Sequence, residues 1–244
     1  QWQIVLAICL FYLYDAALLL KRDEGLLRRL RHGWTGILAS RGFELRQQWL
    51  LWPSVFVLHQ PLYRLRWNAA QITLPGDMQQ ARHLETHAAS FSAFALPLYL
   101  LATLLFIALP LSLLVLHSEL AQLICLGLIY LCTAALSLLT LRHGRQGHSP
   151  RALARSTALQ IFLCPPFALN VVRKLSMGYP SSADLLQTAH SLMKLDQWQL
   201  LAEQTENWMQ REMQEIAELP EHAEYLAGMR RSLEVLQASH SASH

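Results

Sequence analysis

Two long apolar runs, separated by three polar residues, limit the possible folds of this chain more than any other feature. The first run covers Phe91–Leu116 and the second covers Leu120–Leu141, with His117-Ser118-Glu119 between them. The hydrocarbon core of a bilayer is about 30 Å thick and needs about 20 apolar residues in a helix that rises about 1.5 Å per residue. Because the connection is so short, the two helices must run antiparallel. The sequence therefore predicts a transmembrane hairpin over residues 91–141.

The composition favours a membrane protein over a soluble one. Apolar residues make up 53% of the chain and charged residues only 15%. The apolar residues gather in long runs instead of alternating with charges at helix or strand spacing. The cysteines also lie within apolar runs, which argues against a disulfide framework and against a zinc ribbon. We expect all four to be small packing residues (Cys9, Cys125, Cys132 and Cys164).

A third apolar run, Trp2–Leu20, is broken by Asp15 and followed at once by Lys21 and Arg22. A cleaved signal peptide carries its positive charge before the apolar stretch, whereas here the charge follows it. We therefore expect a retained transmembrane anchor over residues 1–20. The predicted fold class is mainly α and integral membrane, with three transmembrane helices formed by this anchor and the hairpin.

The charges are strongly segregated along the chain. Residues 21–90 hold ten Lys or Arg against five Asp or Glu, residues 142–180 hold six against none, and residues 181–244 hold four against ten. Cytoplasmic loops of membrane proteins carry an excess of Lys and Arg. The sequence thus predicts an amino terminus outside and a carboxyl terminus in the cytoplasm, in the inner (plasma) membrane of a bacterium.

Residues 21–90 are predicted to form a small strand-rich cytoplasmic element and a juxtamembrane helix. Short aromatic and β-branched pieces, punctuated by Gly and Pro, indicate three or four antiparallel strands in a meander. After Pro75-Gly76, the polar stretch Asp77–Ser90 predicts a helix that leads into the second span. The strand-like pieces are Trp34–Leu38, Phe43–Trp52, Ser54–Leu58 and Leu62–Trp67.

The two remaining regions are a basic loop with a short apolar segment, residues 142–180, and a helical cytoplasmic region, residues 181–244. The apolar segment 157–172 contains Pro165-Pro166 and would reach only about 24 Å as a helix. We interpret it as interfacial or re-entrant, and a full span stays open as the alternative. Beyond Ser181, three amphipathic helices are expected, the second ending at Pro220, with a frayed tail over Ala238–His244.

Asp15 is the first candidate functional residue, because a carboxylate inside an apolar helix costs about 2.5–3.5 kcal/mol at the centre of a bilayer. Such acids often lie on a transport path. The alternative is an ordinary charge paired with Lys21 or Arg22 near the cytoplasmic end of the anchor.

Histidines flank the predicted hairpin on its cytoplasmic side. His83 and His87 stand at i and i+4 on one helix face, and His143 and His148 follow the second span. This spacing can hold a metal ion, and histidines around a hairpin are typical of membrane di-iron oxidoreductases such as desaturases. Those enzymes carry denser histidine boxes, so an ordinary solvated helix face is the alternative. Iron or zinc is expected only if these histidines form a metal site, and no other cofactor is predicted.

Basic residues beside the apolar runs are expected to contact anionic lipid head groups, at about 1 kcal/mol per charge. Their position next to a membrane favours this over nucleic-acid binding. The residues concerned are Lys21, Arg22, Arg28, Arg29, Arg142 and Arg145.

The function predicted from these observations is non-catalytic: an integral membrane scaffold or accessory subunit that docks partner proteins at the cytoplasmic face. Large apolar side chains in the carboxyl-terminal helices need a cover that so short a region can hardly supply, which favours a protein partner or a homo-oligomer. These side chains are Trp198, Trp208, Met209 and Met213. The alternatives are a histidine-ligated metalloenzyme acting on a lipid-like substrate, and a small transport or channel subunit that uses Asp15.

Overall fold

The computed structural model describes residues 2–38, 43–45, 48–52, 57–217 and 222–241, and it is about 68% helical with a few short strands. The chain folds into two compact units, each built from three separate stretches of sequence. The first unit contains residues 1–17, 52–61 and 87–179, and the second contains residues 18–51, 62–86 and 180–244.

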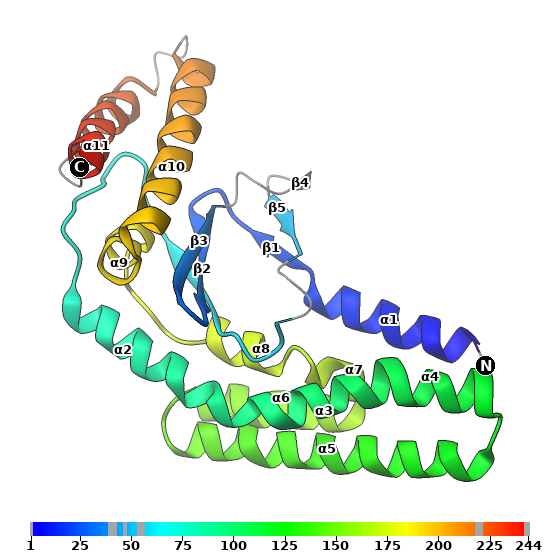
Figure 1. Cartoon of the computed structure of the whole chain (residues 1–244). Coiled ribbons are helices and arrows are strands. Elements are labelled where there is room, and N and C mark those ends of the chain that lie inside the picture. The colour runs from blue at the N-terminus through cyan, green and yellow to red at the C-terminus, as the bar shows by residue number, and fades with distance from the viewer. Residues whose placement is uncertain (1, 39–42, 46–47, 53–56, 218–221, 242–244) are drawn as a thin grey trace. The chain divides into compact units, whose positions relative to one another are not determined.

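Two long helices form much of the first unit (Figure 1). One continuous helical stretch covers Met78–Leu116, of which residues 87–116 belong to the first unit, and the other, α5, covers Glu119–Arg145. Both are long and apolar enough to cross a membrane. The first consists of α2 (Met78–Ala89), η2 (Ser90–Phe94), α3 (Ala95–Thr103), η3 (Leu104–Ala108), α4 (Leu109–Leu111) and η4 (Ser112–Leu116). The segments η3 and η4 are π-helical turns on either side of Pro110, whose missing N–H cannot join a regular helical hydrogen-bond ladder.

The hairpin turn has clear local causes. His117 adopts a left-handed backbone conformation with φ 49° and ends the first helix. Ser118 then caps α5, because its side chain accepts a hydrogen bond from the backbone N–H of Ala121. The predicted antiparallel pair of long helices is therefore present.

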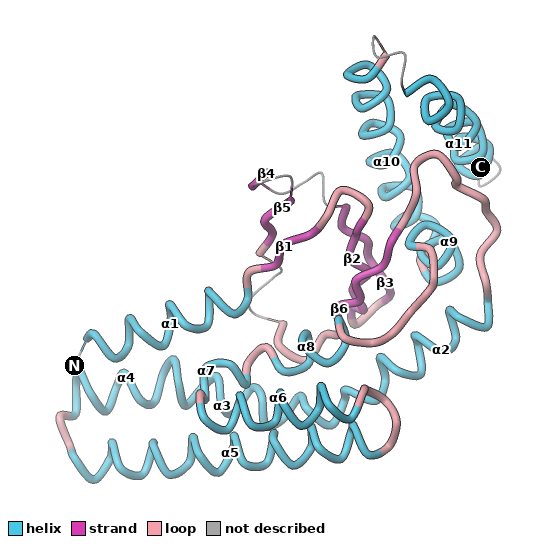
Figure 2. Tube along the Cα trace, turned by 180° about the vertical axis from the view of Figure 1, so that it is seen from behind, coloured by secondary structure: helices cyan, strands magenta, loops and turns pink. Residues whose placement is uncertain are grey.

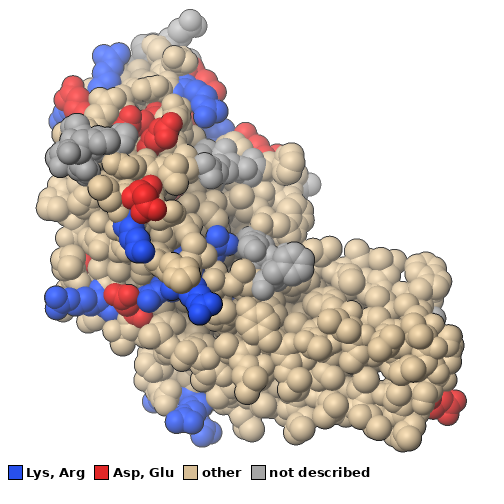
Figure 3. All heavy atoms as spheres, viewed as in Figure 1, with Lys and Arg blue, Asp and Glu red and all other residues tan. Residues whose placement is uncertain are grey.

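Along α5 the buried face carries three hydroxyl groups among apolar side chains, and the outer face is apolar. Thr133, Ser137 and Thr140 are buried, and each hydroxyl donates to a backbone carbonyl. The outward side chains are large and apolar, and the surface over the long helices is almost entirely uncharged in Figure 3. They include Leu120, Leu123, Ile124, Leu126, Leu128, Leu131 and Leu138.

Three further helices return along α5: α6 (Arg151–Leu163), α7 (Pro165–Ala168) and α8 (Val171–Met177). The chain breaks at Cys164, where the backbone is extended before Pro165. With 13 residues, α6 is about 20 Å long, shorter than a hydrocarbon core. The segment 157–172 is thus a kinked pair of short helices, and α8 supplies the centre of the unit's core with Val171, Val172 and Leu175.

The amino-terminal helix α1 (Trp2–Ala16) differs from the predicted span over Trp2–Leu20. It has 15 residues and is about 22 Å long, so two helices reach spanning length instead of three. Leu18–Leu20 forms the strand β1, which pairs antiparallel with β5 (Gln48–Leu51). The apolar run continues past the helix because Leu18 and Leu20 are buried in the core of the second unit.

The second unit contains two small antiparallel sheets, seen as the magenta strands of Figure 2. One has the order β1-β5-β4, with β4 at Phe43–Leu45. The other has the order β3-β2-β6 and comprises β2 (Glu24–Leu30), β3 (Gly33–Leu38) and β6 (Leu62–Arg66).

The strands differ from the predicted simple meander. The basic stretch Glu24–Leu30 was not expected to be a strand, yet β2 is the centre of its sheet and pairs with both β3 and β6. Its side chains Leu26 and Leu27 are fully buried, which outweighs the half-buried charges of Arg28 and Arg29 that follow them. The expected strand at Ser54–Leu58 falls largely outside the described residues.

Three helices complete the second unit: α9 (Leu185–Leu192), α10 (Leu195–Ile216) and α11 (Ala223–Ser241). The three predicted amphipathic helices are therefore present. Asp184 caps α9 by accepting hydrogen bonds from the N–H groups of Leu186 and Gln187. The expected end of the second helix at Pro220 and the last residues of the expected frayed tail, 242–244, lie outside the described residues.

Candidate functional site

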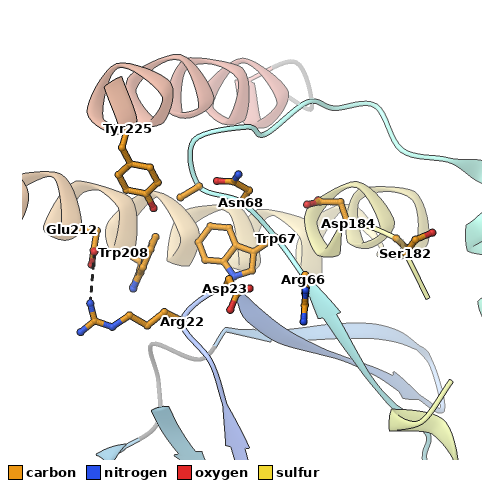
Figure 4. Close-up of a pocket in the computed structure, with 12 residues that line it drawn as sticks. Arg22, Asp23, Arg66, Trp67, Asn68, Ser182, Asp184, Trp208, Glu212 and Tyr225 are labelled. Carbon is orange, nitrogen blue, oxygen red and sulfur yellow. Dashed lines mark ion pairs between the residues drawn. The ribbon is translucent and has the colours of Figure 1, made fainter. Parts of the chain in front are cut away.

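A pocket of about 550 Å³ lies in the second unit, between β6, the start of β2, and the helices α10 and α11 (Figure 4). This volume is within the range of about 300–1,000 Å³ that is usual for ligand sites. Its lining comes from five separate stretches of sequence: Arg22, Asp23, Arg66, Trp67, Asn68, Ala69, Ser182, Ala183, Asp184, Trp208, Glu212 and Tyr225.

Aromatic side chains form the apolar part of the pocket. The Trp67 ring lies edge-on to the Trp208 ring, with ring centroids 5.0 Å apart. Trp67 is held in place because its backbone N–H donates to the Asp23 carbonyl, 2.9 Å away. Its indole Nε1 is buried and has no hydrogen-bond partner among the described residues. A buried indole N–H normally has an acceptor, so this group is an exception within the described residues.

Charged side chains form the polar part of the pocket. Arg22 lies 3.1 Å from a Glu44 oxygen and 3.9 Å from a Glu212 oxygen. Asp184 uses one carboxylate oxygen to cap α9. Burial raises the pKa of Asp184, and its two backbone hydrogen bonds oppose that rise.

Three lining charges are left without an ion pair within the described part of the chain, the guanidinium of Arg66 and the carboxylates of Asp23 and Asp184. The side chains of Arg66 and Asp23 are exposed, and that of Asp184 is half-buried. A guanidinium binds a carboxylate through two parallel hydrogen bonds. The pocket therefore offers a carboxylate-binding group beside an aromatic wall, which suits a ligand with an acidic group next to an apolar one.

The four side chains predicted to dock a partner are placed differently from one another. Trp198 and Met209 are buried inside the second unit, and Trp198 packs against His190 with ring centroids 5.0 Å apart. They are buried because α10 packs on β3 and α11. The second unit itself therefore covers these two side chains. Trp208 and Met213 are half-buried, and only Trp208 lines the pocket.

Asp15 takes part in a polar cluster between α1 and α8 of the first unit. One carboxylate oxygen lies 2.8 Å from Lys174 Nζ, and the other accepts a hydrogen bond of 3.0 Å from Asn170 Nδ2. The lysine also donates to Gln160 Oε1 at 3.3 Å. Asp15 is thus a paired charge, as the alternative to a transport role expected. Its partner, however, is Lys174 and not Lys21 or Arg22.

Three of the four flanking histidines come together in the first unit. Ring centroids are 5.7 Å apart for His87 and His143 and 5.0 Å apart for His143 and His148. His87 Nε2 lies 2.6 Å from the His148 carbonyl oxygen, so Nε2 carries the proton and donates it. Tyr179 covers the other side of the cluster, with its ring 4.3 Å from that of His87. His83 is exposed.

Two members of the histidine cluster, His87 and His143, are uncharged at neutral pH. Both His87 and His143 are buried and lie outside the apolar runs 91–116 and 120–141. Burial lowers the pKa of each of them to about 4, and the neighbouring histidines add to the effect for His143. Within the described residues, no group of three or more His, Cys, Asp or Glu side chains is arranged to hold a metal ion. The iron or zinc site stays a prediction.

The basic residues predicted to meet lipid head groups fall into two sets. Lys21, Arg22, Arg142 and Arg145 are exposed. Arg28 and Arg29 are half-buried in the second unit, where Arg29 pairs with Glu85 at 2.7 Å and lies over the Trp34 ring. Burial lowers the pKa of Arg28.

Most of the pocket was not found from the sequence. Arg22 and Trp208 had been singled out for other reasons, but Arg66, Trp67 and Tyr225 had not. Tyr225 and Arg22 lie far apart in the chain, and no spacing rule connects them. No protein-family model, no curated protein and no solved structure matches the chain.

Proposed function

We propose that this chain is an integral membrane protein of the bacterial inner membrane and that its role is non-catalytic. In this proposal the apolar runs 91–116 and 120–141 of the two long helices cross the bilayer, α1 enters it as a third and shorter helix, and the segment 157–172 is interfacial or re-entrant. The amino terminus lies outside, and the second unit lies in the cytoplasm.

The arrangement of the first unit supports this placement. Soluble proteins rarely expose apolar patches of more than a few hundred Å², whereas α5 exposes large apolar side chains from Leu120 to Leu138. Its hydroxyl groups face the neighbouring helices, as in packed transmembrane helices. The basic residues Arg142, Arg145, Arg151 and Arg155 follow immediately, which agrees with a cytoplasmic α5–α6 turn.

The second unit acts as the docking module of a membrane-anchored scaffold or accessory subunit. The observation that carries this function is the pocket of about 550 Å³ with its unpaired Arg66 beside the Trp67–Trp208 wall. Its occupant is an extended segment of a partner protein that carries an acidic side chain next to an apolar one. The carboxylate pairs with Arg66, and the apolar side chain packs on the aromatic wall.

Site-specific photocrosslinking of the full chain in native membranes tests the docking function. A photoreactive residue replaces Asn68, which is exposed on the rim of the pocket. The matched control replaces His32, an exposed residue beyond the opposite end of β2. We expect a discrete adduct with another protein at position 68 and none at position 32.

A charge reversal makes the same test specific for the pocket. Arg66→Glu should abolish the adduct, while Arg31→Glu, at the far end of β2, should leave it intact. An adduct that persists in Arg66→Glu, or one of equal yield at both positions, would contradict docking in the pocket. An adduct with a second copy of this chain would overturn the assignment to a different partner.

A membrane metalloenzyme is the second candidate, because the fold brings His87, His143 and His148 together. Metal analysis of the detergent-purified chain tests it. Stoichiometric iron or zinc that is lost in His143→Ala would favour this enzyme over the scaffold, and a chain free of both metals would remove it.

A further inference from the structure

A second, smaller pocket lies at the turn between α5 and α6 in the first unit. It has a volume of about 70 Å³ and is lined by three arginines from the two helices. All three arginine side chains are exposed. The complete lining is Leu141, Gly144, Arg145, Arg151, Ala154 and Arg155.

Close packing of the two helices forms this pocket. A Cβ atom on Gly144 would overlap the Cβ atom of Ala154, so only glycine allows the end of α5 to approach α6 this closely. Further along, the Ser137 hydroxyl donates to the Ala158 carbonyl at 3.1 Å and fixes the register of the antiparallel pair. Buried contacts thus fix the two helices from which the three exposed arginines extend.

The positive charge of this pocket is not neutralised within the fold. Residues 142–180 contain no Asp or Glu, and in the described residues Arg145, Arg151 and Arg155 form no ion pair, in contrast to Arg22, Arg29, Arg64 and Lys174. Pro150 precedes the first turn of α6, which no side chain in the described part of the chain caps. Free N–H groups at a helix start favour an anion.

We infer that this pocket binds the phosphate group of an anionic phospholipid. Guanidinium groups match phosphate oxygens with paired hydrogen bonds. Leu141, the last residue of the apolar run 120–141, forms part of the wall, so the pocket lies where the hydrocarbon core would give way to head groups. Basic pockets at this depth on the cytoplasmic side are suited to lipid phosphates. The inference rests on the proposed membrane placement.

Titration of the detergent-purified full chain with phosphatidylglycerol, followed by native mass spectrometry, tests the site. Loss of one bidentate guanidinium should weaken binding of the first lipid about tenfold. We expect this loss in Arg151→Gln and in Arg155→Gln. The matched control is Arg230→Gln, because Arg230 is exposed on α11 and does not line the pocket. Its affinity should stay close to that of the wild type.

Several outcomes would overturn this inference. Equal losses in all three variants would indicate diffuse attraction instead of a site. If inorganic phosphate displaced the bound lipid as well as added lipid does, the pocket would be a site for free phosphate. Arg155→Lys, which keeps the charge and removes the guanidinium, should bind more weakly than the wild type and more tightly than Arg155→Gln. Unchanged melting temperatures without added lipid show that the variants are folded.

Failure of this inference can be told apart from failure of its premise. If labelling places the α5–α6 turn and the 117–119 turn on opposite faces and the variants still bind normally, the phosphate site alone is wrong. If labelling finds both turns on one face, the membrane placement itself is wrong.

Discussion

Replacing Asp15 by alanine tests how α1 is attached to the rest of the first unit. The carboxylate joins two groups of the α7–α8 region, Lys174 at 2.8 Å and Asn170 at 3.0 Å. The side chains of Asp15 and Lys174 are only 13% and 21% exposed. Removal of the carboxylate therefore leaves a lysine charge and an amide without their partner in a place that water reaches poorly.

The expected cost follows from this partial burial. Removing one partner of a fully buried ion pair costs about 3–5 kcal/mol, because the other charge is left uncompensated. Since both side chains keep some contact with solvent, we expect about 3 kcal/mol for Asp15→Ala, near the lower limit of that range. At roughly 2–4 °C per kcal/mol for a chain of this size, the melting temperature should fall by about 6–12 °C.

A double-mutant cycle separates the ion pair from other effects. Lys174→Met removes the charge and keeps an apolar side chain of similar length, so the double variant Asp15→Ala/Lys174→Met contains no buried, unpaired charge. Its loss of stability should be smaller than the sum of the two single losses by about 2 kcal/mol. Melting curves of the detergent-purified chain, read from tryptophan fluorescence, provide the data.

Glu234→Ala is the matched control, because Glu234 is an exposed acid in α11 without an ion pair in the described residues. It should change the melting temperature by no more than about 1–2 °C. Strictly additive losses for Asp15 and Lys174 would refute the pairing. Coupling of Asp15 to Lys21 in place of Lys174 would refute the packing of α1 on α8.

Three further predictions concern the histidine cluster and the second unit. Because the pKa values of His87 and His143 are lowered to about 4 while an unfolded histidine has a pKa of about 6.5, the unfolded chain binds more protons between these values. The free energy of unfolding should therefore be highest above about pH 6.5 and fall by up to about 3 kcal/mol per histidine as the pH drops toward 4. The melting temperature plotted against pH should change less in His143→Phe than in the wild type. The control His83→Phe should leave that pH dependence unchanged. Ser232→Ala removes the acceptor of the buried Ile72 N–H and should cost about 1–3 kcal/mol in denaturant titrations. Ser191→Ala removes a hydroxyl that donates to the Gln187 carbonyl of its own helix and should cost less than half as much. Asp184→Ala removes the cap of α9 and should cost about 0.5–2 kcal/mol, with Asp184→Asn close to the wild type; equal losses in the two variants would argue against capping.

The parts of the fold that were predicted from the sequence depend on local signals. The hairpin was predicted because Phe91–Leu116 and Leu120–Leu141 satisfy a length rule independently of any other residue. The juxtamembrane helix was predicted from the break at Pro75-Gly76 and the polar stretch after it. In the structure Asp77 caps this helix by accepting hydrogen bonds from the N–H groups of Gln79 and Gln80. The alternation in Leu62–Trp67 likewise agrees with the strand β6.

The parts that were missed depend on contacts between distant residues. The apolar run from Trp2 to Leu20 reads as one helix, yet its last three residues form a strand because Gln48–Leu51 pairs with them. Residues 18–20 alone contain no signal that predicts this pairing. The strand β2 was missed for the same reason, since its pairing with β3 and β6 outweighs the polar texture of Arg28 and Arg29.

The candidate pocket illustrates the same limit for function. Its charged and aromatic residues are ordinary surface types in their local sequence, and only the fold assembles them. By contrast, the grouping of His87 with His143 could be anticipated, because both follow from their positions at the same end of two antiparallel helices. The pairing of Asp15 with Lys174 could not be, since it depends on the kink at Cys164-Pro165.

Cysteine labelling in a chain whose four native cysteines are replaced by alanine tests the membrane placement most directly. Glu119→Cys reports on the turn between the two long helices, and Gln146→Cys reports on the turn after α5; both positions are exposed. A membrane-impermeant maleimide added to intact cells stripped of their outer envelope should label position 119, and should label position 146 only after the membrane is opened. Labelling of both positions from the same side, or release of the chain by alkaline carbonate, would contradict the account.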